Sequence, residues 1–284
     1  MTWSKLELTA IRLVLYGSLA AALALFYLPL VTLLVFSVRE GRYLVLPFDG
    51  VTLKWYAAIF EHPDLPEAAR NSLLLAVITM LVSTTLGTLL ALGLQRVRLR
   101  GRTAIGVFVL SPIAMPQLLL GVILLLWFAM GANLFDYSLG LWSAAIGHIV
   151  YTMPFAAVVV GVQLAGLDRS VEEAAADCGA TAWEIYRDIT LPLLWPGILS
   201  AAIFSFLLSW SNFYISFNLA GTSSVLPTFV YAGLSYNSSP LYPALATLVL
   251  IPMAILVVAA EAVRRRGAAR AHGSIAAAVP EVAT

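Results

Sequence analysis

Residues 189–260 form a run of 72 positions without one aspartate, glutamate, lysine or arginine. The whole chain is 61% hydrophobic and 11% charged, whereas a soluble domain carries about 25% charged residues. A bilayer span needs about 20 apolar residues, so this run is too long for one helix. Gly221, Pro227 and the turn at 237–240 interrupt it, which predicts two spans. The chain is therefore expected to be an all-α integral membrane protein.

Six transmembrane helices are predicted in all, separated by polar or charged segments. Their ranges are about 13–38, 71–95, 103–130, 140–167, 192–220 and 241–260. Residues 1–12 precede the first span, 39–66 form a loop with a short amphipathic helix near 53–60, and 264–284 form a tail expected to be disordered. The first apolar run is too long for a signal peptide and more spans follow it, so it is interpreted as a retained helix.

The basic residues predict the orientation of these spans. Twelve of the 16 lysines and arginines lie on one side of the predicted topology, in the N-terminal segment, the 96–102 turn, the loop 168–192 and the tail. The remaining four lie on the other side: Arg39, Arg42, Lys54 and Arg70. By the positive-inside rule, both termini and the loop 168–192 are expected in the cytosol, and residues 39–66 outside the cell.

Two helix starts are predicted in the cytosolic loop. Ser170 is followed three residues later by Glu173, and Thr181 three residues later by Glu184. Each pair is typical of a capping box, in which the hydroxyl accepts a backbone N–H and the glutamate accepts the N–H of the cap residue. The loop is therefore expected to contain two short helices.

Gly179 lies between these two helices, where a helix end favours a residue that accepts a positive φ. Pro192 begins the next apolar run, at a position where a missing N–H costs nothing. The two short helices are thus predicted to meet at an angle at Gly179 and to pack against the start of a long apolar helix. Cys178 is the only cysteine, so no internal disulfide can form, and it is expected to be a small packed residue rather than a nucleophile.

The loop resembles the EAA loop in the permease subunits of bacterial ABC importers, E-A-A-x3-G-x9-I-x-L-P, with every position filled. The matching residues are Glu173, Ala174, Ala175, Gly179, Ile189, Leu191 and Pro192. Further segments look like the spermidine/putrescine (polyamine)-type branch of binding-protein-dependent transport permeases. They include Thr52-x-Lys54-Trp55-Tyr56, Asn71-Ser72-Leu73, Arg96 with Gly101-Arg102, His148 with Pro154-Phe155, and Leu164-x-x-x-Asp168.

This resemblance implies the type I ABC importer permease fold, with a transmembrane domain over 67–263 and cytosolic coupling helices in 168–192. It implies a second permease subunit, two ATPase subunits and an extracellular or periplasmic solute-binding protein as partners, in the lipid of a bacterial cytoplasmic (inner) membrane. ATP and magnesium are expected on the partner ATPase, because this chain has no G-x-x-x-x-G-K-[ST] phosphate loop. No cofactor in this chain and no nucleic-acid partner is expected.

The resemblance assigns the EAA residues to coupling. Closure of the ATPases on ATP would move the helix around 173–179 as a rigid lever and alternate access to the solute path. Glu173 has two compatible roles, as the cap of its own helix and as the ion-pair partner of a basic ATPase residue, and the cap is favoured. Gly179 is expected to be the more sensitive position, because a Cβ there would strain the turn that sets the helix angle.

A polar and aromatic cluster in the fifth predicted span is the candidate solute path: Trp210, Ser211, Asn212 and Tyr214, with His148 from the fourth span. Polar residues within a span usually face the bundle interior or a water-filled path. Hydrogen bonding between helices explains the cluster equally well. For His148, a structural hydrogen bond between helices is favoured over a proton relay or a solute contact.

The sequence disfavours other functional classes. No Ser/His/Asp assembly indicates an enzyme, and His62, His148 and His272 lie in different regions, so no metal site is predicted. A secondary transporter driven by an ion gradient is the alternative function. It would need ionisable groups within the membrane, and His148 is the one such group in the predicted spans.

The expected solute is small, polar and organic. The polyamine branch typically carries acidic residues where this chain has Ser211 and Asn212, and residues 189–260 contain no carboxylate. A dication leaves water at a high cost unless carboxylates or aromatic faces replace its hydration. Either the partner permease supplies acidic groups for a polyamine, or the solute is neutral, zwitterionic or anionic; the composition favours the second.

Overall fold

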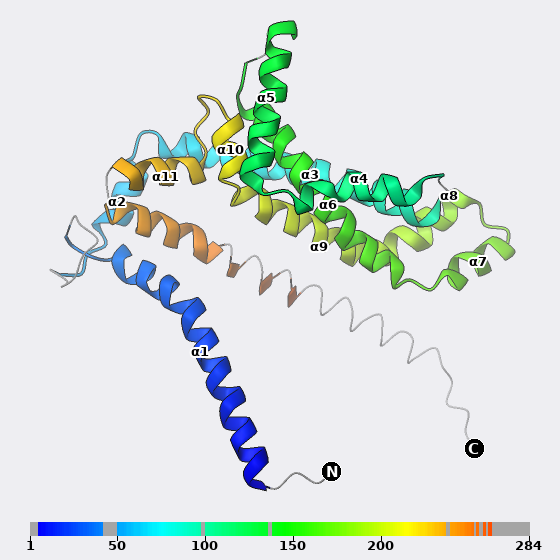
Figure 1. The fold of residues 1–284 in the computed structure, drawn as a ribbon, viewed down its shortest axis with the longest axis horizontal. Helices are drawn as coiled ribbons and strands as arrows, with labels where there is room; N and C mark the ends of the chain where they lie inside the picture. Colours follow the sequence, from blue (N-terminus) through cyan, green and yellow to red (C-terminus); the bar gives the residue numbers. More distant parts are fainter. Residues whose placement is uncertain are drawn as a thin grey trace. The chain divides into compact units, whose positions relative to one another are not determined.

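The structure is a computed structural model that describes residues 5–41, 50–97, 100–135, 138–236, 239–252, 254–255, 258–259 and 261–262. Regular structure in these residues is helical apart from one isolated bridge between Arg39 and Val51 (Figure 1). The chain divides into two compact units, residues 1–63 with 230–254 (unit 1) and residues 64–229 with 255–284 (unit 2). The prediction of an all-α membrane protein is confirmed.

Unit 1 contains the first span. Helix α1 (Lys5–Ser37) includes Pro29 without a break, and its apolar part is exposed except near its C-terminal end, as expected for a surface that lipid or another subunit covers. Helix α2 (Lys54–Glu61) is the short amphipathic helix predicted near 53–60. Its Trp55 donates Nε1–H to the carbonyl of Arg39 at 2.6 Å, which fixes α2 near the end of α1. The unit also holds the end of α11 (Leu226–Tyr236) and a helix over Leu241–Pro252.

Three long helices form the centre of unit 2 and lie side by side in Figure 1: α3 (Leu65–Arg96), α6 (Leu141–Ala165) and α9 (Leu191–Trp210). Small residues allow α3 and α6 to approach closely. A Cβ added to Gly87 would lie 2.8 Å from the Cβ of Ala156, and Ala91 is buried one turn further along. Small residues on α3 thus form a close contact between the two helices.

The third predicted span, 103–130, is broken into two helices. The structure has two helices here, α4 (Arg102–Ala114) and α5 (Gln117–Phe135), which meet at an angle of 109°. Pro116 follows the end of α4 and has no N–H with which to continue the helix. The residue before a proline also avoids the helical region, and Met115 is extended at φ −85° and ψ 134°.

The fifth predicted span, 192–220, is not one helix of that extent. Its helix begins in the loop, because α8 (Ala182–Ile185), a π-helix η1 (Tyr186–Thr190) and α9 continue into one another over 29 residues. It ends at Trp210, and the separate short helix α10 (Tyr214–Leu219) follows, packed against α5 and α6. Polar side chains make the break: Ser211 donates to the carbonyl of Leu207, and Asn212 accepts the N–H of Ile215.

The described residues contain four helices long and apolar enough to cross a membrane, and the bent pair α4–α5 gives a fifth. The predicted spans 71–95 and 140–167 lie within α3 and α6 to within a few residues. The last predicted span, 241–260, is helical over Leu241–Pro252, and several of its later residues lie outside the described part of the chain. The described residues thus do not reach the six spans predicted. The tail 264–284 also lies outside them.

Candidate coupling site and solute path

The loop 168–192 begins with a short polar helix, α7 (Arg169–Asp177). Its cap is Asp168, whose Oδ1 accepts the N–H of Ser170 at 2.9 Å. This backbone hydrogen bond, and to a smaller extent a hydrogen bond from the Ser170 side chain, lowers the pKa of Asp168 below its ordinary value of 3.8. The predicted capping box of Ser170 and Glu173 is therefore wrong: Asp168, two residues earlier, supplies the acceptor.

Glu173 points along the surface of α7 instead of capping it. Its Oε1 lies 3.4 Å from Nε of Arg169, one turn earlier in the same helix, and both side chains are about two-thirds exposed. An exposed pair of this kind contributes roughly 0.3–0.5 kcal/mol to a helix. Ala174 is exposed and Ala175 half-buried, so the three EAA residues lie largely open to solvent. Cys178 is also exposed, which corrects the expectation that it is packed.

Gly179 ends α7 as the sequence predicts. Its φ is +90°, and the N–H groups of Gly179 and Ala180 bond the carbonyls of Ala176 and Ala175 at 2.9 and 3.0 Å. This is the Schellman pattern, which requires a left-handed residue at that position. A Cβ added to Gly179 would meet no atom within 4 Å, so strain at this position would come from the backbone and not from a clash.

The second predicted helix start is confirmed. The backbone N–H of Thr181 is accepted by Oε2 of Glu184 at 2.7 Å, and the Thr181 hydroxyl accepts the N–H of Glu184 at 3.3 Å. This helix then runs through η1 into α9, with Ile189 and Leu191 half-buried and Pro192 exposed near the start of α9. A proline has no N–H for the carbonyl four residues earlier and its ring crowds that carbonyl, which favours a wider π turn just before Pro192.

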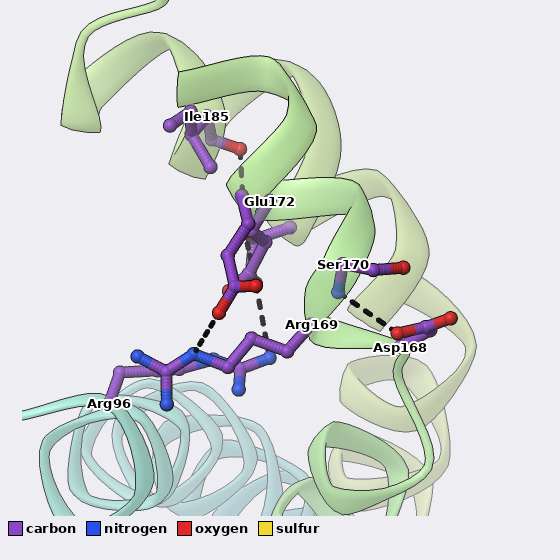
Figure 2. A network of polar contacts seen from close by, with 8 residues as sticks. Arg96, Asp168, Arg169, Ser170, Glu172 and Ile185 are labelled. Atoms are coloured by element: carbon purple, nitrogen blue, oxygen red, sulfur yellow. Dashed lines mark hydrogen bonds and ion pairs between the residues drawn. The ribbon is translucent and has the colours of Figure 1, made fainter. Parts of the chain in front are cut away.

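One important contact of the loop was not predicted. Figure 2 shows the Glu172 carboxylate facing Arg96 at the end of α3. Oε1 of Glu172 lies 3.1 Å from Nη2 of Arg96 and accepts the hydroxyl of Thr190 at 3.0 Å. Thr190 also bonds the carbonyl of Ile185 at 3.3 Å. The sequence signal was available only as an extra glutamate before the EAA motif, since the partners are distant in the chain.

The residues of the candidate solute path separate in the structure. Asn212 is buried, and its Oδ1 accepts the N–H of Ile215 at the start of α10. Ser211 and Tyr214 are exposed, while Trp210 is half-buried and stacks on Phe206 with ring centroids 5.8 Å apart. At the break between α9 and α10, Asn212 therefore faces inward, whereas Ser211 and Tyr214 lie on the surface of this chain.

His148 lies behind this break. It is fully buried in α6, with Nδ1 2.8 Å from the hydroxyl of Ser209 in α9 and Nε2 2.9 Å from the hydroxyl of Ser216 in α10. Both ring nitrogens therefore have partners, one on each side of the break. The Thr152 hydroxyl donates to the His148 carbonyl and bonds Ser83 of α3 at 2.6 Å. This geometry favours the structural role over a solute contact.

Comparison with known proteins identifies the family of this chain. Residues 54–271 match the family described as "Binding-protein-dependent transport system inner membrane component". The spermidine/putrescine transport system permease protein PotC of Escherichia coli K12 is 32% identical over 255 residues, 89% of this chain and 95% of that protein. The putrescine transport system permease protein PotI of the same strain is 31% identical over 228 residues, 79% of this chain and 81% of that protein.

Solved structures share the fold. A bacterial ABC transporter that imports alginate superposes with a TM-score of 0.71 at 17% identity, over 93% of this chain and 99% of that one. The same kind of transporter, described in complex with an alginate pentasaccharide-bound periplasmic protein, gives a TM-score of 0.70 at 17% identity over 93% and 98%. An inward-facing MetNI methionine ABC transporter gives 0.58 at 20% identity over 72% and 95%. The predicted type I ABC importer permease fold is therefore confirmed.

The family match spans most of the chain, and it includes the loop that the sequence singled out. Membership of this family disfavours the alternative of a secondary transporter driven by an ion gradient. The chain belongs to the family of inner-membrane components of binding-protein-dependent transport systems and is a permease subunit of an ABC importer.

Proposed function

We propose that this chain lines one half of a solute path and that its residues 168–192 dock on an ATPase subunit. The observation that carries the proposal is the construction of the loop: a nine-residue helix with no buried residue, a left-handed turn at Gly179, and a second helix that continues into α9. Helices shorter than about 12 residues are marginal in water, so α7 needs a surface that covers it.

The exposed side of the loop has the residues for such a contact. Val171 on α7 and Trp183 on α8 are exposed apolar side chains, and Ala174 is exposed as well. Glu173 is held by a surface ion pair with Arg169, which is worth at most about 1 kcal/mol. Exchange of Arg169 for a basic residue of the ATPase therefore costs little. Ile189, Leu191 and Pro192 then connect the docked segment to α9.

In this proposal, the partner ATPases bind ATP and magnesium and hydrolyse the ATP. This chain is a transport subunit without catalysis of its own. The complex contains a second permease, two ATPases and a periplasmic or extracellular binding protein that delivers solute. The chain is placed in the bacterial inner membrane with both termini cytosolic, because 12 of its 16 basic residues gather on that side of the predicted topology.

The proposed solute is a polyamine. Support comes from the relatives, since both PotC and PotI carry polyamines in their names and cover most of this chain. Residues 189–252 have no carboxylate, so acidic groups for a polyamine must come from the second permease. Tyr214 and Trp210 add aromatic faces, each able to hold a cation with about 0.5–2 kcal/mol.

A neutral, zwitterionic or anionic solute is the second candidate. It is favoured by Ser211 and Asn212, which stand where the polyamine branch carries acidic residues. Calorimetry on the cognate binding protein with spermidine, putrescine, amino acids and organic anions separates the two candidates. Micromolar binding of a polyamine alone supports the first, and binding of an anion or amino acid without polyamine binding supports the second.

The docking proposal can be tested with the native cysteine. Cys178 is the only cysteine of the chain, is exposed and precedes Gly179. An impermeant maleimide should label it in inside-out vesicles and not in right-side-out vesicles. Bound ATPase subunits should protect it. Labelling from the outside would contradict the orientation, and equal labelling with and without the ATPase would contradict the docking site.

The energy source is tested on the same preparation. Solute uptake into vesicles that contain the whole complex should require ATP and the binding protein. It should continue when ionophores collapse the proton and sodium gradients. Uptake that follows an ion gradient in the absence of ATP would contradict the proposal.

A further inference from the structure

Helix α7 is poorly held by apolar packing. None of its nine residues is buried, and only Glu172 and Ala175 are even partly covered. Its larger contacts are with α8 and η1, which belong to the same loop. A helix without an apolar face against the bundle cannot transmit force through packing, so another contact must link it to the membrane helices.

Glu172 provides such a contact. Its carboxylate reaches Arg96 at the end of α3, 76 residues earlier in the chain, at 3.1 Å (Figure 2). The side chains of both residues are about one-fifth exposed, at 22% for Arg96 and 18% for Glu172. By contrast, the neighbouring pair of Arg169 and Glu173 is 65% and 69% exposed and lies within α7. Solvent therefore screens the Glu172 pair much less than the Glu173 pair.

The same oxygen of Glu172 also fixes the start of the long helix. Oε1 accepts the hydroxyl of Thr190, the last residue of η1, and this hydroxyl is buried and bonded to the Ile185 carbonyl as well. One carboxylate oxygen thus joins three elements: α7, the end of α3 and the π turn that leads into α9. Hydrogen bonds to a charged acceptor are shorter and stronger than neutral ones, so these contacts can hold the three elements together when α7 is displaced.

We propose that Glu172 is a positioning residue that makes α7, α3 and the start of α9 move as one body. The proposal rests on the docking function of residues 168–192. In this arrangement the ATPase pushes on α7, and the Glu172 contacts pass the displacement to α3 and α9. Without them, the ATPase still docks and hydrolyses ATP, but α7 moves with less effect on the membrane helices.

The experiment uses the intact importer in proteoliposomes, with solute uptake and ATP hydrolysis measured on the same sample. Glu172→Gln and Arg96→Gln should each keep the ATPase subunit bound and lower the solute taken up per ATP by about fivefold, a size within the range of coupling between contacting residues. The charge-reversed pair Glu172→Arg with Arg96→Glu should recover most of that ratio. Thr190→Val, which removes one of the two links, should lower it less.

Arg100→Gln is the matched control, because it removes one positive charge from an exposed position in the same turn after α3. It should leave the uptake per ATP unchanged. Two results would overturn the proposal: a wild-type ratio in both single variants, or a reversed pair no better than either single variant. Failure of the wild-type chain to bind the ATPase would instead overturn the docking function, so the two failures are distinguishable.

Discussion

The conformation of Gly179 leads to a prediction that separates backbone strain from side-chain size. Its φ is +90°, and an added Cβ meets nothing within 4 Å. An L-residue in the left-handed region costs about 1–2 kcal/mol, whereas asparagine tolerates that region. A cost of one to two kcal/mol corresponds to a factor of roughly 5–30 in the population of the native turn.

Four versions of the chain test this reasoning: glycine, asparagine, alanine and leucine at position 179. ATP-dependent uptake into proteoliposomes is measured at equal ATPase content. We expect glycine to be the most active, asparagine next, and alanine and leucine clearly lower and similar to each other. The similarity follows because the space around Gly179 is open, so the longer side chain meets no additional contact in this chain.

Two results would refute this reasoning. If activity followed side-chain size, with asparagine below alanine, space and not φ would control the position. If alanine matched glycine, the turn at Gly179 would not set the direction of α7. Hydrogen exchange of residues 175–181 in each variant shows independently whether the turn has opened, because the two backbone bonds of the turn protect the amides of Gly179 and Ala180.

Three further outcomes are expected. Gly87→Leu should lower the melting temperature of the detergent-solubilised chain by overpacking α3 against α6, at about 1–3 kcal/mol or more, whereas Gly93→Leu, where an added Cβ meets nothing within 4 Å, should not. His148→Leu should lower melting temperature and uptake together, because it leaves two buried serine hydroxyls unpaired at about 1–3 kcal/mol each; loss of uptake with unchanged melting would instead indicate a solute contact. Because the pKa of Asp168 is lowered in the folded loop, its carboxylate stabilises α7 fully above pH 3.8, and this stabilisation is lost as the pH falls through the folded-state pKa. Hydrogen exchange of α7, corrected for intrinsic rates, should therefore rise at acid pH. The Asp168→Asn variant should not show this rise.

Local signals in the sequence predicted the loop well. The cap of Thr181 and Glu184 and the turn at Gly179 each depend on residues within four or five positions of one another, so their pattern is legible in the chain. The Ser170 cap failed for an equally local reason. Asp168 competes for the same backbone N–H groups, and which acceptor prevails depends on how the chain leaves α6, which the sequence does not show.

Contacts between distant segments were not predicted. The EAA spacing selects Glu173, whereas in the structure Glu172 bonds Arg96. This contact could not be predicted, because Arg96 lies 76 residues earlier and leaves no pattern in the loop. Pro116 marks where α4 ends, but the 109° bend between α4 and α5 and the packing of α5 against α10 leave no local pattern in the sequence. The end of α9 at Trp210 likewise depends on side-chain hydrogen bonds of Ser211 and Asn212, within a run that has no charged residue.

The π-helix at Tyr186–Thr190 changes the phase of the helix that contains it. A π turn holds one residue more than an α turn, and each residue of an α-helix advances the helix by about 100°. The faces of Ala182–Ile185 and of α9 are therefore offset by about that angle from the faces of an uninterrupted α-helix. A one-residue deletion within 186–190 would restore the regular repeat and rotate the cytosolic end of the helix about its axis, while leaving the apolar surface of α9 unaltered. The orientation of this loop is thus set by a count of residues as well as by their chemistry.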